Sequence, residues 1–199
     1  MCPLLETIYL NNGVFRNLTL HEGRMRNAME TLFHTKYSIL LADILSHECV
    51  PSEGLFKTRI IYDSEIKKIE FVPYIMRPVQ SLKLIHDNSI SYKYKFLDRA
   101  TLDNLFAQRA EADDILIVRD GLITDTWYAN IILKKEGRWF TPDSYLLNGT
   151  MRQSLLDAGL VEEIRIGVSD LKQYQSARMI NSMLGMDGPE ISINSICKG

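Results

Sequence analysis

The sequence reads YKYKFLDR at residues 92–99, a stretch in which aromatic residues alternate with lysines. The amphipathic pattern that follows predicts a helix over residues 98–110. A lysine attacks an aldehyde only in its neutral form, and burial lowers the pKa of a lysine toward that form. Lys93 and Lys95 are both candidates for such a nucleophile, because residues two apart in an extended segment share one face. The alternative interpretation of either residue is a surface lysine whose ammonium group reaches solvent.

The residues before this stretch predict a small lobe in which strands and helices are mixed. The expected elements are strands over 4–10 and 14–17, helices over 21–33 and 38–45, a hairpin over 55–62 and 66–74, and a strand over 81–85. Asn11-Asn12-Gly13 is typical of a tight hairpin turn, since Asn and Gly tolerate a positive φ. A polar, proline-containing connection then predicts a lobe boundary between residues 82 and 83.

The second half, residues 83–199, predicts a larger α+β lobe. After the helix over 98–110 we expect strands over 115–118, 131–133 and 139–141, a helix over 150–158, and a tail with strands over 164–166 and 179–181 and a helix over 169–173. Asp120-Gly121 and Glu136-Gly137 indicate tight turns within this region. The fold class predicted from the pattern alone is therefore α+β, in two unequal lobes.

Composition and charge exclude several classes of protein. Lys and Arg total 23 against 25 Asp and Glu, so the chain has no basic surface for nucleic acid. No stretch approaches the roughly 18 apolar residues of a membrane helix, and the first residues do not resemble a secretion signal. The three cysteines are far apart and odd in number, and the four histidines lack metal-ligand spacing. We therefore expect a reduced, cytoplasmic protein without bound metal.

Seven short segments, taken in order, resemble the class IV (fold type IV) pyridoxal-phosphate aminotransferases and lyases. They are ETI (6–8), HEGRM (21–25), YKFLDR (94–99), ADDIL (112–116), TDTWYAN (124–130), TP (141–142) and LNGTMR (147–152). No single segment is specific, but the ordered set covers most of residues 4–184. The resemblance implies a two-lobed fold like that of D-amino acid aminotransferase, with a shortened N-terminal lobe, assembled as a homodimer.

Two residues take central roles if the resemblance holds. Lys95 keeps the family's spacing to Asp98 and Arg99, which implies that it forms the Schiff base with the cofactor and shuttles the substrate proton. Asp125 stands where the family has a Glu that faces the pyridine nitrogen and keeps the ring protonated. Asp is one methylene shorter than Glu, and a capped turn is the alternative interpretation of this segment.

The phosphate of the cofactor requires hydrogen-bond donors. Residues 149–151 lie at a predicted helix start, where backbone N–H groups and the helix dipole favour an anion, and Arg24 adds a forked guanidinium. The alternative interpretations are a helix cap for residues 149–151, an exposed helix arginine for Arg24, and an ordinary strand end for Asn181 and Ser182. The complete set of cofactor-binding residues that the resemblance implies is Arg24, Lys95, Asp125, Asn130, Gly149, Thr150, Met151, Asn181 and Ser182.

The resemblance implies an aminotransferase that moves an amino group between a small amino acid and a 2-oxo acid. The second reading is 4-amino-4-deoxychorismate lyase, which eliminates pyruvate, because NGTMRQ at residues 148–153 is similar to that branch of the family. The third reading is a degenerate member that binds a ligand or a partner protein without turnover. The short first lobe and the Asp in place of Glu at residue 125 motivate this reading.

Overall fold

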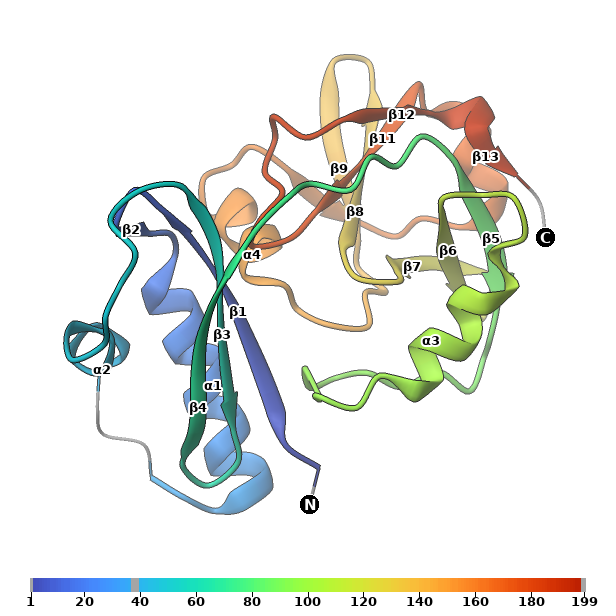
Figure 1. The fold of residues 1–199 in the computed structure, drawn as a ribbon. Coiled ribbons are helices and arrows are strands. Elements are labelled where there is room, and N and C mark those ends of the chain that lie inside the picture. The colour runs from blue at the N-terminus through green and yellow to red at the C-terminus, as the bar shows by residue number, and fades with distance from the viewer. Residues whose placement is uncertain (1, 37–39, 198–199) are drawn as a thin grey trace. The chain divides into compact units, whose positions relative to one another are not determined.

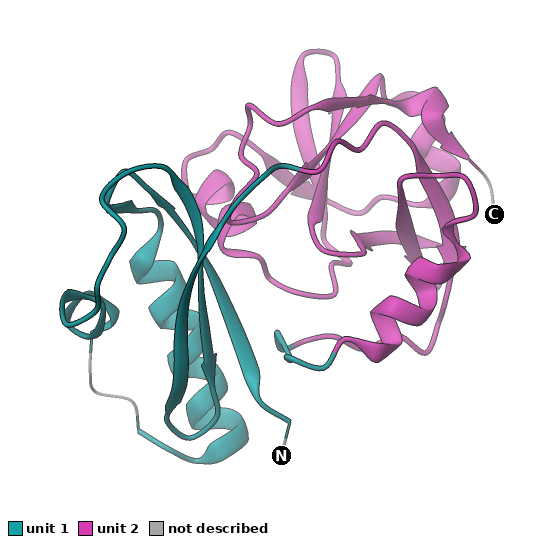
Figure 2. Ribbon diagram, in the orientation of Figure 1, with its two compact units in different colours: residues 1–76, 94–98 teal, residues 77–93, 99–199 magenta. Residues whose placement is uncertain are grey.

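The computed structural model describes residues 2–36 and 40–197, and it divides into two compact units (Figure 1, Figure 2). Unit 1 takes its described residues from 1–76 and 94–98, and unit 2 from 77–93 and 99–199. The sequence predicts a boundary after residue 82. The structure instead places the boundary after residue 76 and assigns residues 94–98 to unit 1. Backbone pairing is the reason: Leu5 N–H donates to the Lys95 carbonyl at 2.9 Å, and Leu97 N–H donates to the Pro3 carbonyl at 2.8 Å.

Unit 1 is an antiparallel sheet with two helices. Its strands are β1 (Leu4–Asn11), β2 (Val14–Phe15), β3 (Leu55–Tyr62) and β4 (Ile66–Pro73), in the order β2-β1-β3-β4, and its helices are α1 (Leu18–Phe33) and α2 (Leu41–Ser46). Helix α1 begins three residues before the predicted start, because Asn17 takes the left-handed conformation, with φ 56°, and turns the chain into the helix. Residues 38 and 39 of the predicted second helix lie outside the described residues.

The core of unit 1 lies between β1 and α1. Alternate residues of β1 are buried, which places Glu6 on the same inward face as Leu4 and Ile8. Helix α1 buries His21, Met25 and Met29, which are four residues apart and therefore share one face of the helix. A carboxylate and an imidazole are thus included in an otherwise apolar interface.

Unit 2 contains two sheets. One sheet joins β5 (Leu82–His86), β6 (Asp114–Arg119), β7 (Leu122–Thr126) and β13 (Ile196–Cys197) in the order β13-β5-β6-β7; the other joins β8 (Asn130–Lys135), β9 (Arg138–Pro142), β10 (Glu162–Ile164), β11 (Ser176–Ile180) and β12 (Glu190–Ser192) in the order β10-β9-β8-β11-β12. The remaining elements are α3 (Ala100–Phe106), α4 (Thr150–Asp157) and three short 3-10 helices, η1 (Ala107–Arg109), η2 (Val168–Gln173) and η3 (Ile193–Ser195).

Three layers of apolar packing hold unit 2 together. The two sheets share one core, to which β6 contributes Leu116 and β8 contributes Ile131. On the far side of β6, helix α3 packs Leu102 against Ile115 and Ile117. On the far side of β8 and β11, α4 packs Met151 and Leu155 against the sheet. Because β8 is buried on both faces, its first residues lie deep in the unit, beside the start of α4.

The predicted α+β class is confirmed, and the tight turns lie where the sequence predicts them. Asp120 and Gly121 have φ of 53° and 76°, and Glu136 and Gly137 have φ of 50° and 77°. Strand β7, which follows the first of these turns, is not among the predicted elements. Every helix within the described residues is too short or too polar to cross a membrane.

Candidate active site

The residues singled out from the sequence form two groups, one in each unit. Arg24 and Lys95 belong to unit 1. The second group belongs to unit 2 and consists of Asp125, Asn130, Gly149, Thr150, Met151, Asn181 and Ser182.

Lys95 lies beside strand β1. Its carbonyl accepts from Leu5 N–H, and the next residue, Phe96, bridges to Leu4. The Lys95 side chain is half-buried, whereas Lys93 is exposed. Of the two lysines, Lys95 is therefore the one with the less solvent-exposed side chain.

Glu6, His21 and Arg24 form a polar group in unit 1, with Glu6 at its centre. Its carboxylate is fully buried and accepts from His21 Nδ1 at 2.6 Å. Arg24 donates to it twice, from Nε at 2.9 Å and from Nη2 at 2.5 Å. This forked ion pair fixes the guanidinium plane of Arg24 on the sheet side of α1. The sequence pattern predicts no role for Glu6, although a Glu at an inward position of an alternating strand is a detectable signal.

The charges within this group are strongly coupled. Burial raises the pKa of Glu6, but the Arg24 guanidinium and the His21 ring outweigh it and bring that pKa to about 2. Burial lowers the pKa of His21 despite its bond to Glu6, and the charges of Arg24 and Lys95 add to this effect. The group therefore consists of an ionised Glu6, a neutral His21 and cationic Arg24 at neutral pH.

Asp125 is the centre of the group in unit 2. It lies near the end of β7 and is 6% exposed. Its Oδ1 accepts from Asn130 Nδ2 at 2.8 Å, and its Oδ2 accepts from the backbone N–H groups of Leu146 at 3.2 Å and Leu147 at 3.0 Å. Burial raises the pKa of Asp125 to about 6, and these three donors and the Arg152 charge oppose that rise. The carboxylate is therefore ionised at neutral pH, and the loss of any one of these donors would raise its pKa further.

The start of α4 lies against Asn130. Gly149 is the N-cap residue of α4 and has no side chain to cap the helix, so the first turn presents backbone amides outward. Thr150 is buried at the first helical position. The Met151 side chain packs in the core with Ile132, so only its backbone can contact an anion.

Arg152 fixes α4 to strand β9. It is 2% exposed, donates to the Pro142 carbonyl at 3.1 Å and pairs with Glu163. The Tyr145 ring lies 4.1 Å from its guanidinium carbon. Arg152 is the last residue of the LNGTMR segment at 147–152. Its contacts with Pro142 and Glu163 orient α4.

Asn181 and Ser182 form a turn at the end of β11. Asn181 Oδ1 accepts from the backbone N–H groups of Met183 at 2.8 Å and Leu184 at 3.0 Å, so this side chain shapes the turn. The turn lies next to the Asp125 group, because Ile180 pairs with Asn130 across β11 and β8. The structure thus brings all the predicted residues of unit 2 to one place.

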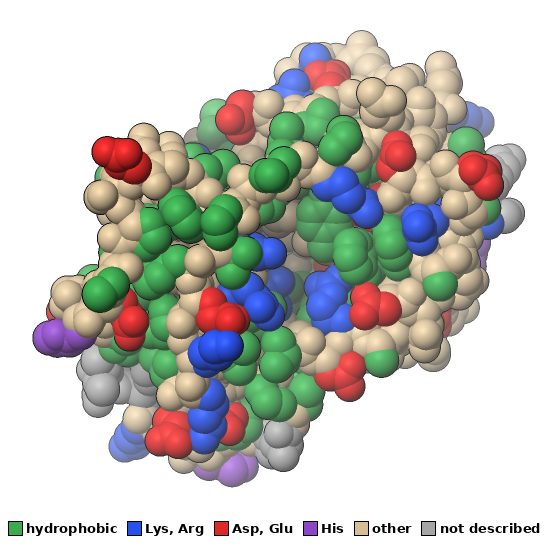
Figure 3. Space-filling model, viewed as in Figure 1, with side chains coloured by type: hydrophobic (Ala, Val, Ile, Leu, Met, Phe, Trp, Pro, Cys, Tyr) green, Lys and Arg blue, Asp and Glu red, His purple; other side chains and the backbone are tan. Residues whose placement is uncertain are grey.

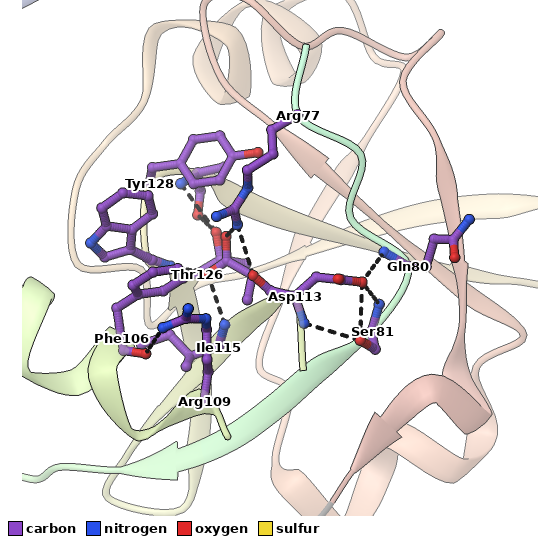
Figure 4. A network of polar contacts seen from close by, with 12 residues as sticks. Arg77, Gln80, Ser81, Phe106, Arg109, Asp113, Ile115, Thr126 and Tyr128 are labelled. Carbon is purple, nitrogen blue, oxygen red and sulfur yellow. Dashed lines mark hydrogen bonds and ion pairs between the residues drawn. The ribbon is translucent and has the colours of Figure 1, made fainter. Parts of the chain in front are cut away.

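A further polar network, which the sequence did not reveal, fixes the loop after β7 (Figure 4). Asp114 is buried and accepts from Arg77 at 2.9 Å and from Trp127 N–H at 3.3 Å, and burial raises its pKa to about 6. Arg99 donates to the Trp127 carbonyl at 2.5 Å. The Phe106 and Trp127 rings are stacked with centroids 4.2 Å apart. Figure 3, viewed as in Figure 1, shows hydrophobic side chains with basic side chains beside them over unit 2.

Comparison with known proteins finds a matching family and similar chains. Residues 4–187 match the family described as "Amino-transferase class IV". An uncharacterized protein of Haemophilus influenzae is 31% identical over 189 residues, which cover 94% of this chain and 100% of that protein. A crystal structure from Haemophilus somnus, described as a candidate 4-amino-4-deoxychorismate lyase, is 32% identical with a TM-score of 0.88, covering 94% of this chain and 98% of that one.

A more distant structure shares the fold. The pyridoxal-phosphate-bound form of a hypothetical aminotransferase from Mycobacterium tuberculosis is 15% identical, with a TM-score of 0.76 over 96% of this chain and 80% of that one. At this identity the likeness concerns the fold alone.

Proposed function

Because this chain belongs to the class IV aminotransferase family, we propose that it is a pyridoxal-phosphate-dependent 4-amino-4-deoxychorismate lyase. The expected family, its fold type and its cofactor, pyridoxal phosphate, are confirmed by this membership. The observation that carries the choice of lyase is the 32% identity, over 94% of the chain, to the structure described as a candidate for that activity. The NGTMRQ segment at residues 148–153 supports the same choice.

The donor set in unit 2 fits the cofactor. A carboxylate has about four acceptor sites, and three protein donors reach Asp125, so it can accept one more hydrogen bond, from a protonated ring nitrogen. The start of α4 offers backbone amides behind a glycine, which suits a phosphate. When bound, pyridoxal phosphate supplies an electron sink for bond breaking at the substrate carbon that carries the amine.

The residues of this chain divide the remaining work. Lys95 attaches the cofactor and moves the proton at the substrate carbon that carries the amine. Asp125 keeps the ring nitrogen protonated. Thr150 and the amide of Met151 bind the phosphate from α4, and Ser182 binds it from the turn after β11. We also propose that the protein forms a homodimer and is located in the cytoplasm.

Transamination remains the second candidate. The family match covers residues 4–187 and comprises both reactions, and the residues that hold the cofactor are the same for both. An amino acid and a 2-oxo acid would then replace aminodeoxychorismate as substrates.

One assay separates the candidates. The purified protein, supplied with pyridoxal phosphate, is given aminodeoxychorismate without an amino acceptor, and pyruvate is measured with a coupled dehydrogenase. We expect pyruvate and 4-aminobenzoate in equal amounts, and we expect their loss in Lys95→Ala but not in the matched control Lys93→Ala. Absence of pyruvate in this assay, together with amino transfer when an amino acid and a 2-oxo acid are supplied instead, would contradict the lyase and favour the aminotransferase. A protein that stays colourless with the cofactor would contradict both.

A further inference from the structure

The side chain of Asn130 joins three parts of unit 2. It is the first residue of β8, it bonds to Asp125 near the end of β7, and it lies against Gly149 at the start of α4. We propose that Asn130 is a positioning residue, which sets the Asp125 carboxylate and the first turn of α4 in fixed relation without touching the cofactor. This inference rests on the proposed function, since it assigns the ring partner and the phosphate site to the two elements that Asn130 joins.

The hydrogen bonds of Asn130 leave it no donor for a ligand. A side-chain amide has two N–H donors. One donates to Asp125 Oδ1 at 2.8 Å, and the other donates to the Leu147 carbonyl at 2.8 Å. The opposite orientation of the amide would direct its oxygen at a carboxylate oxygen, so the chemistry fixes the assignment. A phosphate, which accepts hydrogen bonds, therefore finds no donor on this side chain.

The oxygen of the same amide occupies the space beside Gly149. A Cβ on residue 149 would overlap Asn130 Oδ1 and would lie 3.2 Å from its Cγ. Gly149 has φ −71° and ψ 142°, a conformation open to any residue. Glycine is therefore required here by the neighbouring amide and not by the backbone. Asn130 and Gly149 are complementary in size.

Leu147 closes the arrangement. Its N–H donates to Asp125 Oδ2 while its carbonyl accepts from Asn130, so one residue bonds to both partners. Asp125, Asn130 and the segment leading into α4 form a closed ring of hydrogen bonds. If Asn130 is removed, Asp125 keeps the two backbone donors but loses the link that aligns it with the helix.

A double-substitution cycle tests the packing. Thermal unfolding is measured without added cofactor for Gly149→Ala, Asn130→Ala and the combination. We expect Gly149→Ala to lower the midpoint by more than about 5 °C, and by less than half as much when residue 130 is already Ala. Asn104→Ala, an exposed asparagine on α3, is the control, and its combination with Gly149→Ala should be additive. Equal effects of Gly149→Ala in both backgrounds would overturn the size complementarity.

A pH profile tests the positioning. With the cofactor bound, we expect Asn130→Ala to move the acidic limb of kcat/KM upward by about one pH unit, because Asp125 loses a donor to its charged form. Asn130→Ser should partly restore the wild-type profile. An unmoved limb would overturn the positioning role. Since the unfolding cycle needs no cofactor, a non-additive cycle in a protein that never takes up pyridoxal phosphate would overturn the proposed function and leave the coupling standing.

Discussion

Glu6 illustrates how one residue can organise a group of charges. It occupies an inward position of β1, where its neighbours on that face are Leu4 and Ile8. A buried carboxylate without partners is costly, but here His21 and Arg24 supply three hydrogen bonds. The arrangement places a fixed guanidinium close to the segment that carries Lys95.

Substituting Glu6 with Gln should destabilise the protein in a pH-dependent way. The change leaves the Arg24 guanidinium without its buried counter-charge, which costs about 3 kcal/mol at pH 7. The pKa of Glu6 is lowered from 4.5 to about 2 on folding, so its stabilising effect is present above pH 4.5 and is lost as the pH falls toward 2. Urea unfolding at pH 7 and pH 3 measures the effect, and the difference between wild type and variant should shrink at pH 3.

The control for this experiment is an ion pair in solvent. Glu70 pairs with Arg59 across β3 and β4 and is 26% exposed, so Glu70→Gln should change the unfolding free energy by less than about 1 kcal/mol. A Glu6→Gln loss as small as that of the control, or one that is the same at both pH values, would contradict the account of Glu6.

The candidate residues were predicted from the sequence to very different degrees. Lys95, Asp125 and Gly149 are predicted as site residues because each lies in a short motif with fixed spacing. The partners that hold them, such as the Leu146 and Leu147 amides on Asp125, come from residues more than 20 positions away. Such contacts depend on the packing of β7 against the loop before α4, which no local pattern encodes.

At the scale of elements, glycine substitutions separate turn geometry from helix propensity. Gly121 has φ 76° in the turn between β6 and β7, whereas Gly23 is an exposed helical residue of α1 with open space around it. We expect Gly121→Ala to destabilise the protein by about 1 kcal/mol and Gly23→Ala to stabilise it by about 0.8 kcal/mol. Denaturant unfolding measures both, and changes of the same sign would contradict the assigned conformations.

The strand predictions succeeded where the pattern was local and failed where it was not. The hairpin of β3 and β4 was predicted within one residue of its ends, because alternation and turn residues both mark it. Strand β7 has the sequence LITDT, and its buried polar residues are typical of a turn. Strand β12 has three residues and β13 has two, so their pairing with β11 and β5 gives no periodic signal.

At the scale of the whole molecule, the boundary between the units differs from the one the composition suggests. The segment 94–98 belongs to unit 1 through backbone bonds to β1, some 90 residues earlier in the sequence. Long-range pairing of this kind leaves no local mark. It nevertheless decides which side chains surround Lys95.

The activity of the holoenzyme should depend on the ionisation of Asp125. Its pKa of about 6 without ligand will be lowered by a protonated ring nitrogen, so kcat/KM should rise with pH through an apparent pKa at or below about 6. Asp125→Asn cannot carry the charge, and we expect it to reduce kcat roughly 100-fold at every pH. A variant that keeps full activity would contradict the role of Asp125.

The most direct measurement is reduction of the holoenzyme with borohydride, followed by proteolysis and mass spectrometry. The account predicts a phosphopyridoxyl group on the peptide that contains Lys95, with trypsin failing to cut after that residue, and the same label in Lys93→Ala. A label on Lys93, on another lysine, or on none would contradict it.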